Sequence, residues 1–120
     1  MFGLGRRKAS PQTFHNITMG YQIAIEEVKP LAEDARVAGL SDEAERLERY
    51  VVLFRRRETE VSDASRNLQD LADELEPIMT DIGGIEAALN IGADYAAYGC
   101  AFAAAHLRTA AAIARGEKLA

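Results

Sequence analysis

The last third of the chain is the segment that most restricts the possible fold, because it is long, apolar and built from small residues. Between residues 87 and 107 alanine and glycine dominate, and before His106 the only ionisable side chains are Asp94, Tyr95, Tyr98 and Cys100. A helix of this composition must be covered on most of its surface. A chain of 120 residues leaves little other material to cover it. The sequence therefore predicts that this helix packs closely and that it meets a second copy or a partner protein.

The positions of this segment that share one helical face are mostly small. The face follows a heptad spacing through Leu89, Gly92, Ala96, Gly99, Ala103, His106, Ala110 and Ile113. Small residues in such a row allow another backbone to approach closely. We therefore predict an assembly interface formed by Leu89, Gly92, Ala96, Gly99, Ala103 and Ala110.

Two further heptad patterns precede this one. The first contains Phe14, Ile17, Tyr21, Ala24, Val28, Leu31, Ala35 and Ala38, and Gly39 ends it. The second contains Ala44, Leu47, Val51, Phe54, Glu58, Val61, Ser65, Leu68, Ala72, Leu75, Met79 and Ile82. Pro30 lies inside the first pattern and removes a backbone donor there, so we expect a kink or a short break near residues 27–29.

Capping and helix-breaking residues set the expected boundaries. Ser41 is a favourable N-cap, and no glycine or proline occurs between Leu40 and Glu76. We therefore favour one continuous second helix over two helices that divide near Thr59 to Asp63. Pro77 and the turn signal at Asp81 to Gly84 end this helix, and the third helix runs from about Ile85 to Arg115.

These patterns predict an all-α protein. We expect an up-and-down bundle of three long helices, or four if the second divides near Thr59 to Asp63, with coiled-coil-like packing. Residues 1–12 are expected to form a flexible basic N-terminal tail, and residues 13–120 a single helical-bundle domain.

The distribution of charge argues against nucleic acid as a partner. The net charge is −5, although Arg6, Arg7 and Lys8 make the N-terminus basic. The other basic run, residues 55–57, is flanked by glutamates and is typical of a solvated helix face.

The compartment predicted from the sequence is the cytoplasm. A single cysteine, Cys100, excludes an intrachain disulfide, and no apolar signal segment follows the basic N-terminus. Met1 to Lys8 has the composition to touch an anionic membrane weakly, but we favour a free tail. Asn90, Asp94 and His106 likewise argue against a transmembrane helix between residues 87 and 107.

The sequence lacks the motifs of common catalytic and cofactor sites. It has no glycine-rich phosphate loop, and neither His15 nor His106 follows a glutamate at the spacing of a helical di-iron site. We therefore expect no metal, cofactor or enzymatic activity. Cys100 is expected to be a small buried hydrophobe. Ordinary core packing is favoured over a ligand cleft for the aromatic residues Phe14, Tyr21, Tyr95, Tyr98 and Phe102.

His106 is the one candidate functional residue. A histidine bonded at a helix interface is favoured over a haem ligand or a phosphate acceptor. The run Ala105 to Ala110 resembles the histidine segment of phosphotransfer domains, but Thr109 and Ala110 stand where that family has lysine and glycine. The sequence therefore does not assign the chain to that family.

The function predicted from these observations is protein–protein association. We expect a small non-enzymatic structural or adaptor protein of bacterial or phage type, which self-associates through its Ala/Gly-rich C-terminal helix or binds a protein partner. The alternative is a histidine phosphorelay or small-ligand-binding bundle centred on His106.

Overall fold

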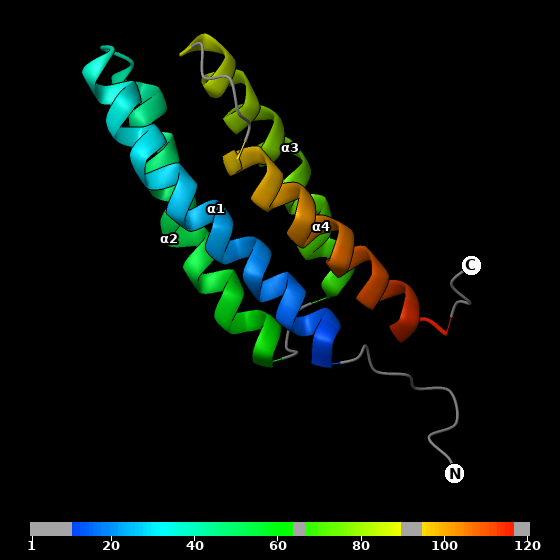
Figure 1. The fold of residues 1–120 in the computed structure, drawn as a ribbon. Helices are drawn as coiled ribbons and strands as arrows, with labels where there is room; N and C mark the ends of the chain where they lie inside the picture. The colour runs from blue at the N-terminus through cyan, green and yellow to red at the C-terminus, as the bar shows by residue number, and fades with distance from the viewer. Residues whose placement is uncertain (1–10, 64–66, 90–94, 117–120) are drawn as a thin grey trace.

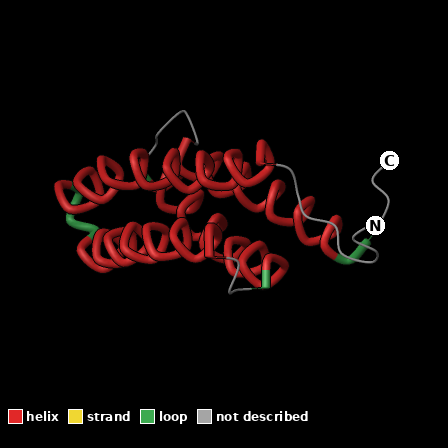
Figure 2. The backbone as a smooth tube through the Cα atoms, turned by 90° about the horizontal axis from the view of Figure 1, so that it is seen from below, coloured by secondary structure: helices red, strands yellow, loops and turns green. Residues whose placement is uncertain are grey.

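The described part of the chain is almost entirely helical. The computed structural model describes residues 11–63, 67–89 and 95–116. They form four helices, α1 (Pro11–Val37), α2 (Ser41–Asp63), α3 (Leu68–Ala88) and α4 (Tyr95–Ala114). Figure 2 shows these helices and their turns, with no strand in the described ranges. The prediction of an all-α bundle is confirmed.

The four helices run alternately up and down (Figure 1). Helix α1 packs along both α2 and α4, and α3 packs along α4, whereas few residues of α2 and α3 touch. The start of α1 and the end of α4 lie at the same end of the bundle (Figure 1). One side of the bundle, between α2 and α3, is therefore packed less closely than the others.

The hydrophobic core combines heptad positions of all four helices with residues outside those patterns, among them Leu71 and Leu107. Its largest fully buried side chains are Tyr21, Phe54, Ile17, Leu47, Leu71, Leu75, Ile82 and Leu107. The centroids of the Tyr21 and Phe54 rings lie 5.9 Å apart, which joins α1 to α2 in the core. The apolar spacing in the sequence therefore identified the faces that pack.

The second predicted helix is two helices, so the expectation of one continuous helix was wrong. Helix α2 ends at Asp63, and α3 begins at Leu68 behind an N-cap at Asn67. The Asn67 side chain accepts hydrogen bonds from the backbone nitrogens of Gln69, at 2.8 Å, and Asp70, at 3.3 Å. This cap satisfies donors that would otherwise be unpaired at the start of a new helix, and it favours the four-helix alternative.

The short break expected near Pro30 and the helix end expected at Pro77 are absent, since α1 and α3 run through these prolines. Pro30 and Pro77 are exposed, as are Glu26 and Asp73, the residues four positions earlier whose carbonyl groups lose a helical partner. Helix α3 also continues through Gly83 and Gly84 because Ile78, Ile82 and Ile85 hold its inner face in the core. The predicted boundary at residues 77–84 was therefore wrong, and α3 ends at Ala88.

Helix α1 begins at Pro11, so Pro11 and Gln12 belong to the bundle rather than to the predicted tail. The basic segment Met1 to Lys8 lies outside the described residues.

Candidate functional site: the outward face of α4

Helices α1 and α4 cross at two glycines, where their backbones are in contact. A Cβ atom on Gly99 would lie 2.6 Å from the backbone nitrogen of Ala24 and 3.0 Å from the carbonyl oxygen of Gly20. A Cβ atom on Gly20 would lie 2.6 Å from the backbone nitrogen of Ala103. Side-chain carbons in proteins essentially never come closer than 3.0 Å to such atoms, so both positions require glycine. The small residues of α4 therefore do permit a close backbone approach.

The partner in this close approach is α1 of the same chain rather than a second subunit. Four of the six residues predicted to form an assembly interface, Ala96, Gly99, Ala103 and Ala110, are buried. Leu89 is partly buried against the core, and Gly92 lies outside the described residues. The buried part of the Gly/Ala face consequently offers no surface to another copy.

The sequence did contain the signal for this contact. Gly20 and Ala24 are four residues apart on α1, as are Gly99 and Ala103 on α4. Two such pairs on antiparallel helices match each other and allow the close crossing. The first heptad pattern contains Ala24 but not Gly20, so the heptad spacing alone does not predict this match.

The outward side of α4 carries a row of rings, which we call the aromatic face: Tyr98, Phe102 and His106. These residues are spaced four apart along the helix. The ring centroids of Tyr98 and Phe102 lie 6.0 Å apart, and those of Phe102 and His106 lie 4.6 Å apart. Tyr98 is 55% exposed, and Phe102 and His106 are partly exposed. The expectation that Tyr98 belongs to the core was therefore wrong, whereas Tyr21 is buried as expected.

His106 is partly exposed and packs on Phe102. Arg108 forms an ion pair with Glu76 of α3 and therefore lies on a different side of α4. The histidine and this arginine are close in sequence but do not form one site.

A polar contact joins α2 to the end of α3. The Arg46 guanidinium donates two hydrogen bonds to the Asp81 carboxylate, at 2.9 Å and 3.0 Å, and the Tyr50 hydroxyl donates a third. Arg46 holds the pKa of Asp81 below its ordinary value. Partial burial, together with the bond to Asp81, raises the pKa of Tyr50 to about 12.

A second polar contact joins α2 to the first half of α3. Arg57 donates two hydrogen bonds to the Glu74 carboxylate, at 2.8 Å and 2.9 Å, and two more to Glu60. The sequence predicted that Arg57 lies on a solvated face with its neighbours. Its side chain is only 11% exposed, because it fills the loosely packed side of the bundle between α2 and α3.

The buried core contains two ionisable groups whose neutral forms are favoured. Burial raises the pKa of the Cys100 thiol to about 12, and the charge of Glu86 adds to the shift. A thiol of this kind is inert at neutral pH, in agreement with the prediction that Cys100 is a core residue. Burial also raises the pKa of Tyr21, whose hydroxyl has no hydrogen-bond partner among the described residues.

Neither a metal centre nor a membrane-spanning helix is found in the described ranges. No group of three or more His, Cys, Asp or Glu residues there is arranged to hold a metal ion. Within the same ranges, no helix combines the length and the apolar character needed to cross a bilayer.

Comparisons of the chain with protein-family models, with curated proteins and with solved structures give no match.

Proposed function

We propose that this protein is a small non-enzymatic adaptor that binds a protein partner through the aromatic face of α4. The observation that carries the proposal is the exposure of Tyr98, whose ring continues the row of Phe102 and His106. Tyrosine and phenylalanine are enriched at protein interfaces because they offer large contact areas at a low entropic cost. The aromatic face takes the place of the predicted Gly/Ala interface, since α1 covers the latter.

Affinity capture with matched variants tests this proposal. Tyr98→Arg places a charge at the most exposed residue of the aromatic face and is expected to abolish retention of a specific host protein. Val37→Arg, at the exposed end of α1, is the matched control and is expected to retain it. Equal retention by both variants, with unchanged helical circular dichroism, would reject the aromatic face as the binding surface.

The proposal includes two predictions made from the sequence, which concern the type of helix packing and the cellular compartment. Coiled-coil-like packing of the helices is supported by the heptad positions that line the core. A cytoplasmic location is supported by the single unpaired cysteine.

A histidine phosphorelay is the second candidate, and the partial exposure of His106 is the observation that favours it. Arg108 does not support a phosphorelay function, because its guanidinium forms an ion pair with Glu76. Incubation with a small phosphodonor such as acetyl phosphate, followed by mass spectrometry, tests this function. A relay predicts an acid-labile phosphate that is absent from His106→Gln, and the lack of any such adduct would exclude it.

A further inference from the structure

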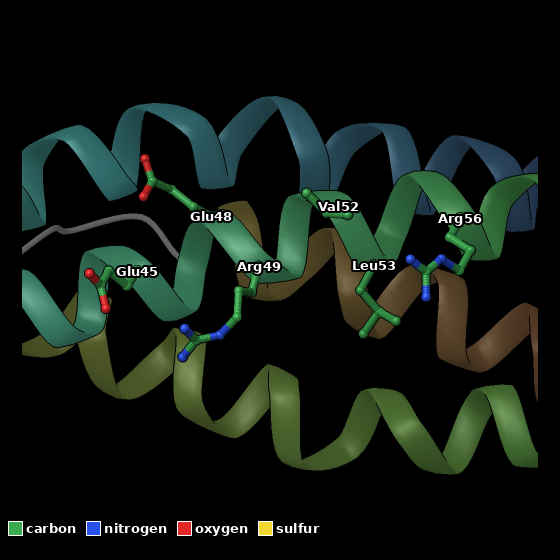
Figure 3. Close-up of a pocket in the computed structure, with 6 residues that line it drawn as sticks. All are labelled: Glu45, Glu48, Arg49, Val52, Leu53 and Arg56. Atoms are coloured by element: carbon green, nitrogen blue, oxygen red, sulfur yellow. The ribbon is translucent and has the colours of Figure 1, made fainter.

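The outward surface of α2 contains an open depression that no other helix of the bundle covers. Its volume is about 550 Å³, and it is lined by Glu45, Glu48, Arg49, Val52, Leu53 and Arg56 (Figure 3). Val52 is 57% exposed, which is unusual for a large apolar side chain in this structure. We call these six residues the α2 face.

Charges on the exposed side of α2 are ordered along the helix. The exposed acidic residues Asp42, Glu45 and Glu48 come first, and the exposed basic residues Arg49, Arg55 and Arg56 follow. The helix dipole accounts for acids in the first turn. It does not account for the arginines, because they lie before the last turn and that turn contains no basic residue.

Only some of these charged side chains form ion pairs within the chain. Glu48 pairs with Arg36 of α1 at 2.7 Å. Neither Glu45 nor Arg56 forms a hydrogen bond or an ion pair with any residue in the described ranges. The two ends of the α2 face therefore carry opposite charges that no hydrogen bond or ion pair among the described residues engages.

We propose that the α2 face binds the α2 face of a second copy, with the two helices antiparallel. A two-fold axis between Tyr50 and Val51 brings Glu45 opposite Arg56 of the second copy, and the symmetry repeats this ion pair. The same axis brings Arg49 opposite Val52, so that the aliphatic part of the arginine covers the exposed valine. Each residue of one α2 face therefore lies opposite a residue of the α2 face of the second copy.

Charge selects both this orientation and the kind of partner. A parallel pair of α2 helices would place acids against acids and arginines against arginines, which repel each other. The antiparallel pair places opposite charges together at both ends. The association is weak, because Val52 is the one strongly exposed apolar side chain of the α2 face that it covers. It also depends on salt, because the ion pairs between the two copies lie at the surface. This inference uses a different helix from the proposed function and does not depend on it.

Sedimentation equilibrium of the full chain with charge-reversed variants tests the proposal. The wild type is expected to associate reversibly at about 0.05 M salt and much less at about 0.5 M salt. Glu45→Arg and Arg56→Glu should each weaken association at least about tenfold, because each replaces two attractive contacts by two repulsive ones. Glu45→Arg/Arg56→Glu in one chain restores opposite charges and should restore association. Glu26→Arg, at an exposed position of α1, changes the net charge by the same amount as Glu45→Arg and should have no effect.

Three results would overturn the proposal: a wild type that stays monomeric at millimolar concentration, single variants that associate like the wild type, or a double variant that fails to associate. Helical circular dichroism establishes that each variant is folded, and Val52→Asp provides a second variant that should dissociate the pair. Tyr98→Arg should leave association unchanged, so failure of the proposed partner binding and failure of self-pairing are distinguishable.

Discussion

Two glycines determine how closely α1 and α4 approach each other. At Gly20 an added methyl group would lie 2.7 Å from the Cβ atom of Ala103, so a side chain there must push the helices apart. Gly84 of α3 is also helical, but a Cβ atom there would meet nothing within 4 Å. The same substitution is therefore expected to have opposite effects at these two positions.

Gly20→Ala should lower the free energy of unfolding by about 1–3 kcal/mol, since overpacking at a backbone contact exceeds the gain in helix propensity. Gly84→Ala should raise it by about 0.5–1 kcal/mol because alanine restricts the unfolded chain and favours the helix. Urea denaturation of both variants measures the two changes. A stabilising Gly20→Ala would contradict the close contact between α1 and α4.

A second prediction at the residue scale concerns Asp81. The Arg46 guanidinium and the Tyr50 hydroxyl lower the pKa of its carboxyl group in the folded protein. A lowered folded pKa gives stability that is present above the unfolded pKa and is lost as the pH falls through the folded pKa. The pH window for this loss therefore lies below the ordinary value of 3.8.

Asp81→Asn should lower the stability at pH 7 by about 1 kcal/mol, because the ion pair is partly exposed and screened by solvent. The difference from the wild type should shrink as the pH falls below the ordinary pKa of Asp81. Urea denaturation at a series of pH values provides this comparison. A difference that stays constant at acidic pH would show that the Asp81 charge contributes nothing.

At the scale of helices, the N-cap of α3 explains why a continuous heptad pattern divides. Asn67 bonds the backbone nitrogens of Gln69 and Asp70 and so stabilises a new helix start at Leu68. Asn67→Ala should reduce the free energy of unfolding by about 0.5–2 kcal/mol. Asn67→Asp retains an acceptor and is the control that should stay close to the wild type. Equal stability of wild type and Asn67→Ala would mean that the cap has no role in dividing the helices.

The sequence predicted the packed faces of the helices well and their ends poorly. Apolar spacing alone placed Tyr21, Phe54 and Leu75 in the core, where the structure has them. The helix end predicted at Pro77 was wrong, because the cost of a proline inside a helix depends on whether the residue that loses its hydrogen bond is exposed, and this follows from tertiary packing.

The candidate site was harder to predict than the fold. Small residues at Gly99 and Ala103 indicated a close helix contact, but spacing within α4 does not say whether the other helix belongs to the same chain. In the structure the other helix is α1, whose Gly20 and Ala24 lie against them. The exposure of Tyr98 follows from which side of α4 is covered, so it also required the packed bundle.

At the scale of the molecule, the bundle has three closely packed helix contacts and one polar one. The α1–α4, α1–α2 and α3–α4 contacts are extensive, while α2 and α3 are connected mainly through Arg46 and Arg57 and their partners. Arginine spans such a gap because its long side chain fills space and its charge is satisfied by carboxylates. In this arrangement α1 and α4 form the centre of the fold.

The most direct test of this account is a joint measurement of mass and thermal stability for Gly99→Leu. The bulk of leucine at the α1–α4 crossing should lower the melting temperature by several degrees, on the order of 5–15 °C, while the mass in dilute solution equals that of the wild type. Sedimentation equilibrium and thermal circular dichroism on the same samples provide both values. A Gly99→Leu variant that melts like the wild type but has lost a subunit would contradict an intrachain contact and place this glycine between chains.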